Sequence, residues 1–185
     1  MEGSRILSLV YRRRKAVSKI KMFAFIALIS LAFGIALVGN VMAGERGKVV
    51  FRDVHFATGF PSAQVPDTEG HAIYLLEAKG MSFSEKWGPC LFVQSAVGDY
   101  TKGLGPYEGY VHYTYPDGST ITAKVKGEAK SVGKGITGGG GGGGTWTYIK
   151  GTGRFEGIQG GGTGRYWVLG PGQWYSDSEG EYTLP

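Results

Sequence analysis

The segment that most constrains the fold runs from Thr145 to Gly170 and reads TWTYIKGTGRFEGIQGGGTGRYWVLG. Its two ends, Thr145–Ile149 and Arg165–Leu169, are rich in β-branched and aromatic residues, which favour strands. The glycines between them permit positive φ, so the chain can turn tightly and fold Phe155 and Ile158 back as plugs. This pattern predicts one corner of a small antiparallel barrel.

The first 43 residues have the character of a targeting segment rather than of a folded domain. A basic stretch precedes Met22–Val38, a run of seventeen residues without a charge, and Val41 and Ala43 then match the small-residue pattern of a signal-peptidase site. We expect cleavage after Ala43 and export to the periplasm or the medium. The alternative is an uncleaved anchor helix, since seventeen residues are at the short limit for a membrane span. The leader would then be the chain's one link to a membrane.

The positive charge of the chain belongs to this leader. The whole chain carries +5, but residues 1–43 hold seven Lys and Arg and one acidic residue, which leaves 13 basic and 14 acidic side chains in residues 44–185. A nucleic-acid partner is therefore not expected, because no concentrated basic face remains to neutralise phosphates.

The chemistry-bearing residues form no catalytic or metal-binding signature. Cys90 is the one cysteine and is interpreted as a buried small hydrophobic residue, with no base partner at a motif spacing. The three histidines are too scattered for metal ligation, and the glutamates suit solvated faces. We expect no metal and no cofactor, and the sequence leaves any catalytic residue unknown. The histidines are His55, His71 and His112, and the glutamates are Glu77, Glu108, Glu128 and Glu156.

Residues 44–185 predict a single all-β domain, a small antiparallel eight-stranded β-barrel of calycin-like type. No segment after the leader has a helical period.

Residues 79–80 are expected to turn the chain. Residues 90–97 are apolar on both faces, which predicts a strand covered by loops or by another subunit. Residues 131–144 are expected to be a flexible Gly-rich surface loop, since the seven glycines at 138–144 bring no side chain to bury. Strands are expected at 48–56, 72–78, 90–97, in a hairpin over 107–128, and at 145–149, 165–169 and 179–184.

The hairpin has two registers, which differ in the loop at Tyr115–Ser119. A two-residue Asp-Gly loop would mix Lys with apolar residues on one face. A three-residue Pro-Asp-Gly loop pairs Tyr113 with Ile121 and Val111 with Ala123, which leaves one face apolar and the other polar. We choose the three-residue loop. It points Tyr113 and Tyr115 inward and His112 outward.

The segment GTGRFEGIQGGGT at 151–163, preceded by an aromatic strand and followed by Gly-x-Tyr at 180–182, resembles bacterial members of the allene oxide cyclase barrel-like superfamily, which also includes the dirigent proteins. The resemblance is strongest over residues 105–185. It implies an eight-stranded barrel with an apolar cavity. Characterised relatives cyclise or orient reactive small molecules without a metal or a cofactor. Several of those relatives are trimers, so a homotrimer is implied here. The catalytic acid of the plant cyclases matches no position of this sequence.

These observations favour an exported barrel that binds a small apolar or aromatic molecule in its cavity. The alternatives are a cofactor-independent cyclase or isomerase and a purely structural oligomeric barrel. The aromatic residues also have a simpler interpretation, because the interior of an eight-stranded barrel is just wide enough to be filled by side chains. The residues that we expect to line a ligand pocket are Tyr74, Gln94, Tyr113, Tyr115, Trp146 and Trp167.

The leader gives a first testable prediction. The exported protein should begin at Gly44, because Val41 and Ala43 fit the signal-peptidase pattern. N-terminal sequencing of the exported protein measures this directly. Recovery of a chain in the membrane fraction that still begins at Met1 would contradict cleavage and favour the anchor.

Overall fold

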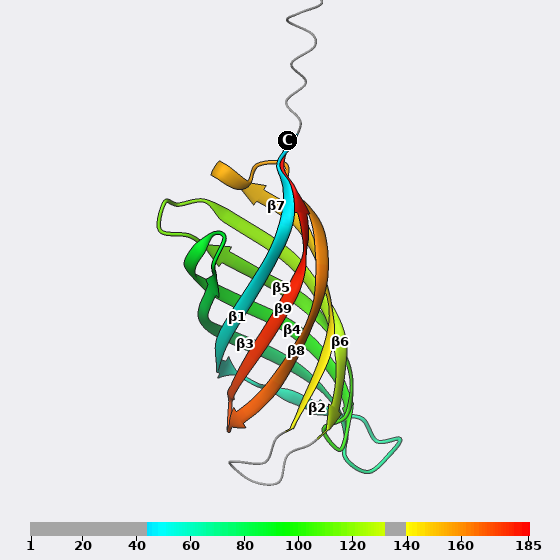
Figure 1. The fold of residues 1–185 in the computed structure, drawn as a ribbon. Coiled ribbons are helices and arrows are strands. Elements are labelled where there is room, and N and C mark those ends of the chain that lie inside the picture. The colour runs from blue at the N-terminus through cyan, green and yellow to red at the C-terminus, as the bar shows by residue number, and fades with distance from the viewer. Residues whose placement is uncertain (1–43, 132–139) are drawn as a thin grey trace, which may run out of the picture. The chain divides into compact units, whose positions relative to one another are not determined.

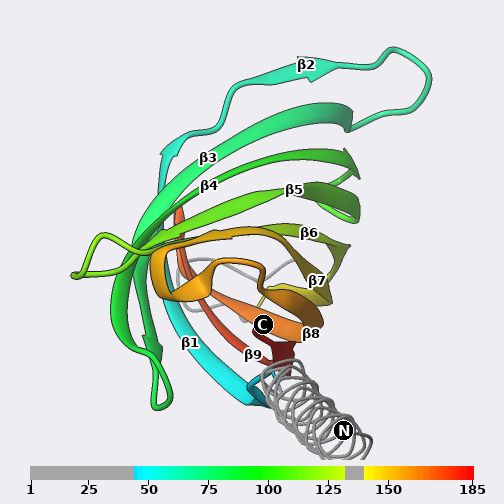
Figure 2. The ribbon, with the colours of Figure 1, turned by 90° about the horizontal axis from the view of Figure 1, so that it is seen from above.

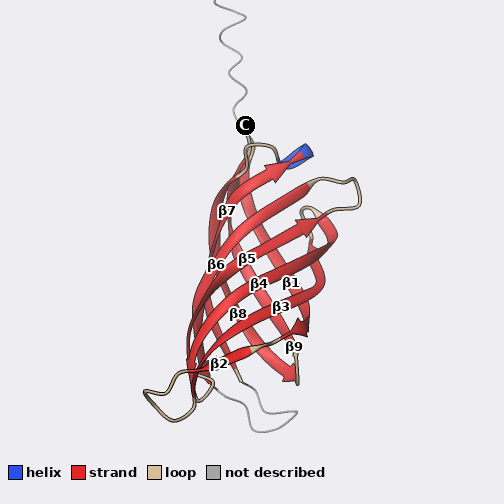
Figure 3. Ribbon diagram, turned by 180° about the vertical axis from the view of Figure 1, so that it is seen from behind, coloured by secondary structure: helices blue, strands red, loops and turns tan. Residues whose placement is uncertain are grey.

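The computed structural model describes residues 44–131 and 140–185, and these belong to one compact unit, Gly44–Pro185. The leader predicted at residues 1–43 lies outside the described residues. Strands make up almost all of the described chain, and η1 (Gly153–Phe155) is the one short helix in it (Figure 3). No helix in this part of the chain has the length and apolar character to cross a membrane.

Eight long strands form a closed antiparallel barrel, as the sequence predicted, with one short extra strand (Figure 1). Closure comes from β1, which pairs with β9 on one side and with β3 on the other. The extra strand β2 pairs with β3 alone and lies outside the ring of strands (Figure 2). The strands are β1 (Arg46–Gly59), β2 (Ser62–Gln64), β3 (His71–Ser84), β4 (Gly88–Thr101), β5 (Gly105–Thr114), β6 (Thr120–Ser131), β7 (Gly141–Thr152), β8 (Gln159–Gly170) and β9 (Gln173–Thr183).

Strand β4 shows how the period of two along a strand divides inside from outside. Cys90, Phe92 and Ala96 are buried, whereas Leu91 and Val93 between them are 62% and 57% exposed. The strand is therefore apolar on both faces, as predicted, but no loop of the described chain covers its outer face. The homotrimer, which would cover such a face, remains a prediction.

The hairpin of β5 and β6 has the three-residue register. Tyr113 pairs with Ile121 and Val111 with Ala123. The Tyr115 N–H donates to the Ser119 carbonyl at 3.0 Å, and Gly118 takes a φ of 81°, the left-handed conformation that this loop requires. Tyr115 is 2% exposed and faces inward as expected.

On the other face of this hairpin, His112 is only half-buried rather than fully exposed. Its Nδ1 lies 2.9 Å from the Thr122 hydroxyl, on the residue directly across the hairpin.

An aromatic plug fills the end of the barrel where η1 lies. Phe155 is 1% exposed and Ile158 is 5% exposed, so both are the plugs that the glycine pattern predicted. The Phe155 ring centroid lies 5.0 Å from that of Trp87, in an edge-on arrangement, and 4.7 Å from that of Tyr115. These are spacings at which aromatic pairs attract each other.

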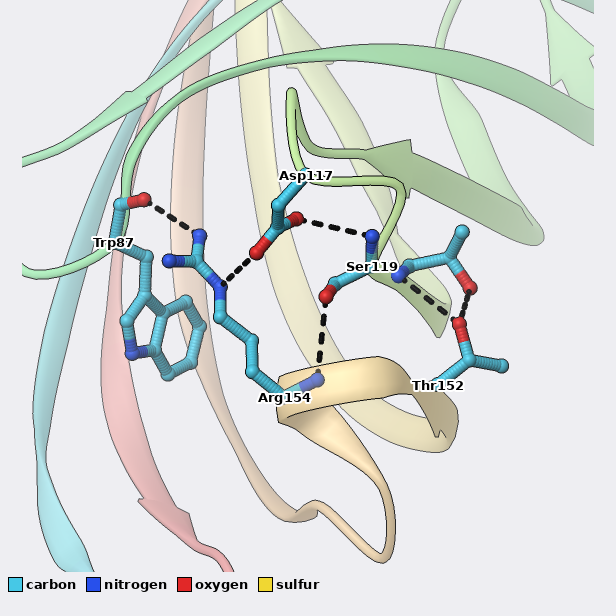
Figure 4. Close-up of polar contacts among 6 residues, drawn as sticks. Trp87, Asp117, Ser119, Thr152 and Arg154 are labelled. Atoms are coloured by element: carbon cyan, nitrogen blue, oxygen red, sulfur yellow. Dashed lines mark hydrogen bonds and ion pairs between the residues drawn. The ribbon is translucent and has the colours of Figure 1, made fainter.

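Arg154 ties three turns together over this plug (Figure 4). Its Nη2 donates to the Trp87 carbonyl at 2.9 Å, and its Nε lies 3.3 Å from the Asp117 carboxylate. Its backbone N–H donates to the Ser119 hydroxyl at 3.2 Å. The guanidinium also lies 4.9 Å from the Tyr115 ring centroid and 4.8 Å from that of Phe155, so cation–π attraction adds to the contact.

Two sequence predictions about glycines were wrong. Residues 79–80 do not turn the chain, because β3 continues to Ser84 and Gly80 lets β1 approach: a Cβ there would lie 1.9 Å from the Val54 carbonyl oxygen. Within the predicted flexible loop, residues 141–144 form the first part of β7, paired with both β6 and β8. A Cβ at Gly142 would lie 2.0 Å from the Glu128 carbonyl oxygen, so glycine is required there by close packing. Residues 132–139 lie outside the described residues.

The plug gives a second testable prediction. Phe155→Ala should lower the free energy of unfolding by about 3–5 kcal/mol, because it removes a buried ring and leaves a cavity among Trp87 and Tyr115. Urea denaturation measures the change. Leu169→Ala is the control, since Leu169 is 53% exposed and should change stability by no more than about 0.5 kcal/mol. Equal effects of the two variants would contradict the plug.

Candidate functional site

A cavity of about 500 Å³ occupies the interior on the side of the barrel away from the plug. We call it the lumen cavity. Four of the six residues expected to line a pocket lie on its wall, and they come from four different strands: Tyr74 of β3, Gln94 of β4, Tyr113 of β5 and Trp146 of β7. They lie together because each occupies an inward position of its strand.

The structure places the other two expected residues elsewhere. Tyr115 packs in the plug against Phe155 and does not line the lumen cavity. Trp167 is 41% exposed on the outer surface, where its ring stacks on Tyr175 at 6.0 Å between centroids. Its neighbour Tyr166 lines the cavity instead. Both tyrosine and tryptophan suit either face of a strand, so the local sequence left the phase of β8 undetermined.

A polar cluster on the wall was missed by the sequence analysis. It consists of Asp53 and His55 on β1 and Ser176 on β9, all of which line the cavity. The Ser176 hydroxyl donates to Asp53 Oδ2 at 3.3 Å, and His55 Nε2 lies 2.9 Å from the same hydroxyl oxygen. The direction of the His55–Ser176 hydrogen bond depends on the tautomer of the imidazole: with the proton on Nε2, His55 donates to Ser176 and its Nδ1 is an acceptor.

The sequence does contain a signal for two of these residues. Val49 and Phe51 set an inward phase that continues to Asp53 and His55 along the same strand. Polar residues in the apolar phase of a strand are the informative exception, since buried polar groups cost free energy unless they are paired. Ser176 carries no such signal, because its position depends on the pairing of β9 with β1.

Burial controls the protonation of the cluster. Burial raises the pKa of Asp53 to about 6, while hydrogen bonding by Ser82 and then by Ser176 acts in the opposite direction and the nearby Asp177 charge adds to the increase. Burial lowers the pKa of His55 to about 4, so the imidazole is neutral at pH 7. Its ring lies between Trp174, stacked at 4.7 Å, and Phe92, tilted at 4.7 Å.

Three acceptor atoms among the lining residues have no hydrogen-bond partner within the described chain: Asp53 Oδ1, His55 Nδ1 and Gln94 Oε1. Buried polar atoms in native proteins are nearly always paired, with protein, water or a ligand. Ser82 is the nearest side-chain hydrogen-bond partner of Asp53, and Gln94 is that of His55. A water or a ligand in the cavity would complete the pairing of these atoms.

The opposite wall combines glycines with large side chains such as Trp146 of β7 and Tyr166 of β8. Around the ring of strands, β6 lies farthest from β1, and the inward positions of β6, β7 and β8 include Gly127, Gly144 and Gly164. A Cβ at Gly144 would lie 2.2 Å from the Lys126 carbonyl oxygen. These glycines keep side chains out of the lumen, which leaves room opposite the polar cluster.

The described residues offer neither a reactive cysteine nor a metal centre. Burial raises the pKa of the Cys90 thiol to about 11, so this cysteine stays protonated and is a poor nucleophile at neutral pH. Within residues 44–131 and 140–185, no three His, Cys, Asp or Glu side chains are grouped as metal ligands.

Comparison with known proteins gives little beyond the fold. No protein family model and no curated protein sequence matches this chain. Among solved structures, that of a pterocarpan synthase dirigent protein is similar at a TM-score of 0.47 and 9% sequence identity, over 79% of this chain and 88% of that chain. Similarity at this level carries no inference about the activity of this chain.

The buried carboxylate gives a third testable prediction. The pKa of Asp53 is about 6 in the fold against an ordinary value of 3.8, so the folded state binds the Asp53 proton more tightly than the unfolded state. The stabilisation that this proton provides is complete below pH 3.8 and is lost as the pH rises to about 6. The loss amounts to about 3 kcal/mol. Asp53→Asn should therefore gain stability relative to the wild type as the pH rises from about 4 to about 6, as measured by urea denaturation.

His55 should behave in the opposite way. Its pKa is about 4 against an ordinary 6.5, so its contribution is full above pH 6.5 and is lost as the pH falls towards 4. His55→Gln should gain stability relative to the wild type as the pH falls.

The exposed-site control Glu156→Gln should show neither trend. A difference between wild type and Asp53→Asn that does not change with pH would contradict a buried, ionisable Asp53.

Proposed function

We propose that this barrel binds a small apolar or aromatic molecule in the lumen cavity. The observation that carries the proposal is a cavity of about 500 Å³ with aromatic walls and a small polar cluster at one side. Ligand sites in proteins typically have volumes of roughly 300–1,000 Å³, mostly apolar walls and a few polar groups that orient the ligand. If the leader directs export, the ligand would be met outside the cytoplasm.

The simpler interpretation, that aromatic side chains fill the barrel, accounts for only one end of it. Trp87, Tyr115 and Phe155 pack against one another in the plug. Beyond the plug, each of three adjacent strands has an inward glycine among its larger inward residues, which leaves space beside Trp146 and Tyr166. The remaining volume is far more than one water molecule needs, which is roughly 30 Å³.

A cofactor-independent isomerase or cyclase is the second candidate function. The observation that favours it is Asp53, because a carboxyl group whose pKa is near 6 can exchange a proton with a bound substrate close to neutral pH. The cavity would hold the substrate in a reactive conformation. NMR spectroscopy of a ligand recovered after incubation distinguishes the two functions, because a binding protein returns the molecule unchanged, whereas an isomerase or cyclase returns an isomer of the same mass.

Blocking the cavity gives a fourth testable prediction. Ala96 is 3% exposed on the cavity wall, whereas Val93 on the same strand is 57% exposed on the outside. Ala96→Phe should abolish binding of the neutral fluorescent probe N-phenyl-1-naphthylamine, and the control Val93→Phe should bind it like the wild type. Circular dichroism establishes whether each variant is folded, and Leu76→Phe is a second cavity variant. Undiminished binding by folded Ala96→Phe and Leu76→Phe would exclude the lumen cavity as the site.

A further inference from the structure

We propose that the ligand of the lumen cavity is an organic cation: a small molecule with an aromatic or apolar body and a protonated amine that binds at Asp53. This inference rests on the proposed function, and it narrows the ligand from any apolar molecule to one chemical class. It follows from the charge, the hydrogen-bond acceptors and the aromatic rings of the cavity wall.

The cavity wall carries one inward negative charge and no inward positive charge within the described chain. Asp53 is 4% exposed and takes part in none of the ion pairs formed by the described residues. Arg165, the other charged residue of the wall, is exposed and occupies an outward position of β8, between the inward Gly164 and Tyr166. A buried carboxylate without a cation is costly, and a cationic ligand would offset that cost.

The one positive side chain near Asp53 in the described chain is Arg52, which is exposed and lies 4.0 Å from the Asp177 carboxylate, so it offsets the charge of Asp177 rather than that of Asp53. The other titratable groups are His55 on the same strand as Asp53, Cys90 of β4, Tyr113 of β5, and Tyr175 and Asp177 of β9. His55 is neutral at pH 7 because burial lowers its pKa to about 4, and burial keeps Cys90 and Tyr113 protonated and uncharged. Asp177 adds negative charge. The local field therefore favours a cation and opposes an anion such as a carboxylic acid.

The hydrogen-bonding pattern is also that of a cation site. Asp53 Oδ1 and Gln94 Oε1 are acceptors, and His55 Nδ1 is one in the tautomer that carries its proton on Nε2; none of the three has a well-formed hydrogen bond in the described chain, where Ser82 is the nearest partner of Asp53 and Gln94 that of His55. Gln94 lies close enough to His55 to act on its pKa, and Asp53 and His55 are joined through Ser176, so the three belong to one region of the wall. A protonated primary amine has three donors and no acceptor, which complements this set.

The aromatic wall suits the same ligand class. Trp174, Tyr113 and Trp146 line the cavity, and the Trp174 ring stacks directly on His55. The faces of such rings attract organic cations, and most strongly where water is excluded. The apolar part of the ligand would lie on the opposite side of the cavity, beside Gly144 and Gly164.

The test compares three indole probes that differ in one group, with binding measured by isothermal titration calorimetry at pH 7.5. Tryptamine carries a protonated amine, tryptophol a neutral hydroxyl and indole-3-acetate a carboxylate. On the wild-type protein we expect tryptamine to bind at least about tenfold more tightly than tryptophol, as for a hydrogen bond to a charged group, and indole-3-acetate to bind most weakly. Asp53→Asn should remove the preference for tryptamine, and Glu156→Gln should keep it.

A pH series on the wild-type protein provides a readout that needs no variant. Because a proton competes with the amine for Asp53, tryptamine affinity should fall as the pH is lowered from 7.5 to 5, while tryptophol affinity should stay constant. If N-phenyl-1-naphthylamine binds but tryptamine shows neither the preference nor the pH dependence, the cation inference is wrong and the proposed function stands. If no probe binds at all, both are wrong.

Discussion

The contact of Phe155 with Trp87 and Tyr115 divides the interior of the barrel into a filled end and an open end. The glycines on either side of Phe155 allow the chain to fold it inward, and Arg154 then connects the Trp87 carbonyl with the turn at Asp117. Three turns that are far apart in sequence are thereby fixed at one end. Trp87, Tyr115 and Phe155 fill this end, whereas the aromatic rings farther along the barrel line the wall of a cavity.

The cavity itself depends on where small and polar residues lie on the wall. Glycines on β6, β7 and β8 leave space between the larger side chains of one side, and Asp53, His55 and Ser176 place polar atoms on the side of β1 and β9. An interior designed only for stability would bury apolar side chains at these positions, since a buried carboxylate without a partner is destabilising. Retaining such a group in a cavity is typical of a functional site.

Local sequence patterns determined part of this structure. The loop at Tyr115–Ser119 allowed two registers, and the separation of apolar from polar residues on the two faces of the hairpin selected the observed one. Phe155 and Ile158 were predicted from the glycines around them. The inward position of Tyr166 in place of Trp167 depends instead on the pairing of β8 with β7 and β9. Gly141–Gly144 form a strand for the same reason, because their neighbours supply the hydrogen bonds that glycine's own propensity does not favour. The polar cluster joins residues 121 positions apart, which no local pattern reveals.

The central claim is that the lumen holds a ligand-sized space bordered by the carboxylate of Asp53. An experimental crystal structure of the purified protein at high resolution tests it most directly. The account predicts non-protein electron density in the cavity, between Gly144 and Gly164 on one side and the polar cluster on the other, within hydrogen-bond distance of Asp53 Oδ1. A lumen in which the side chains of Tyr113 and Trp146 meet across the barrel and leave no room for a ligand would contradict it.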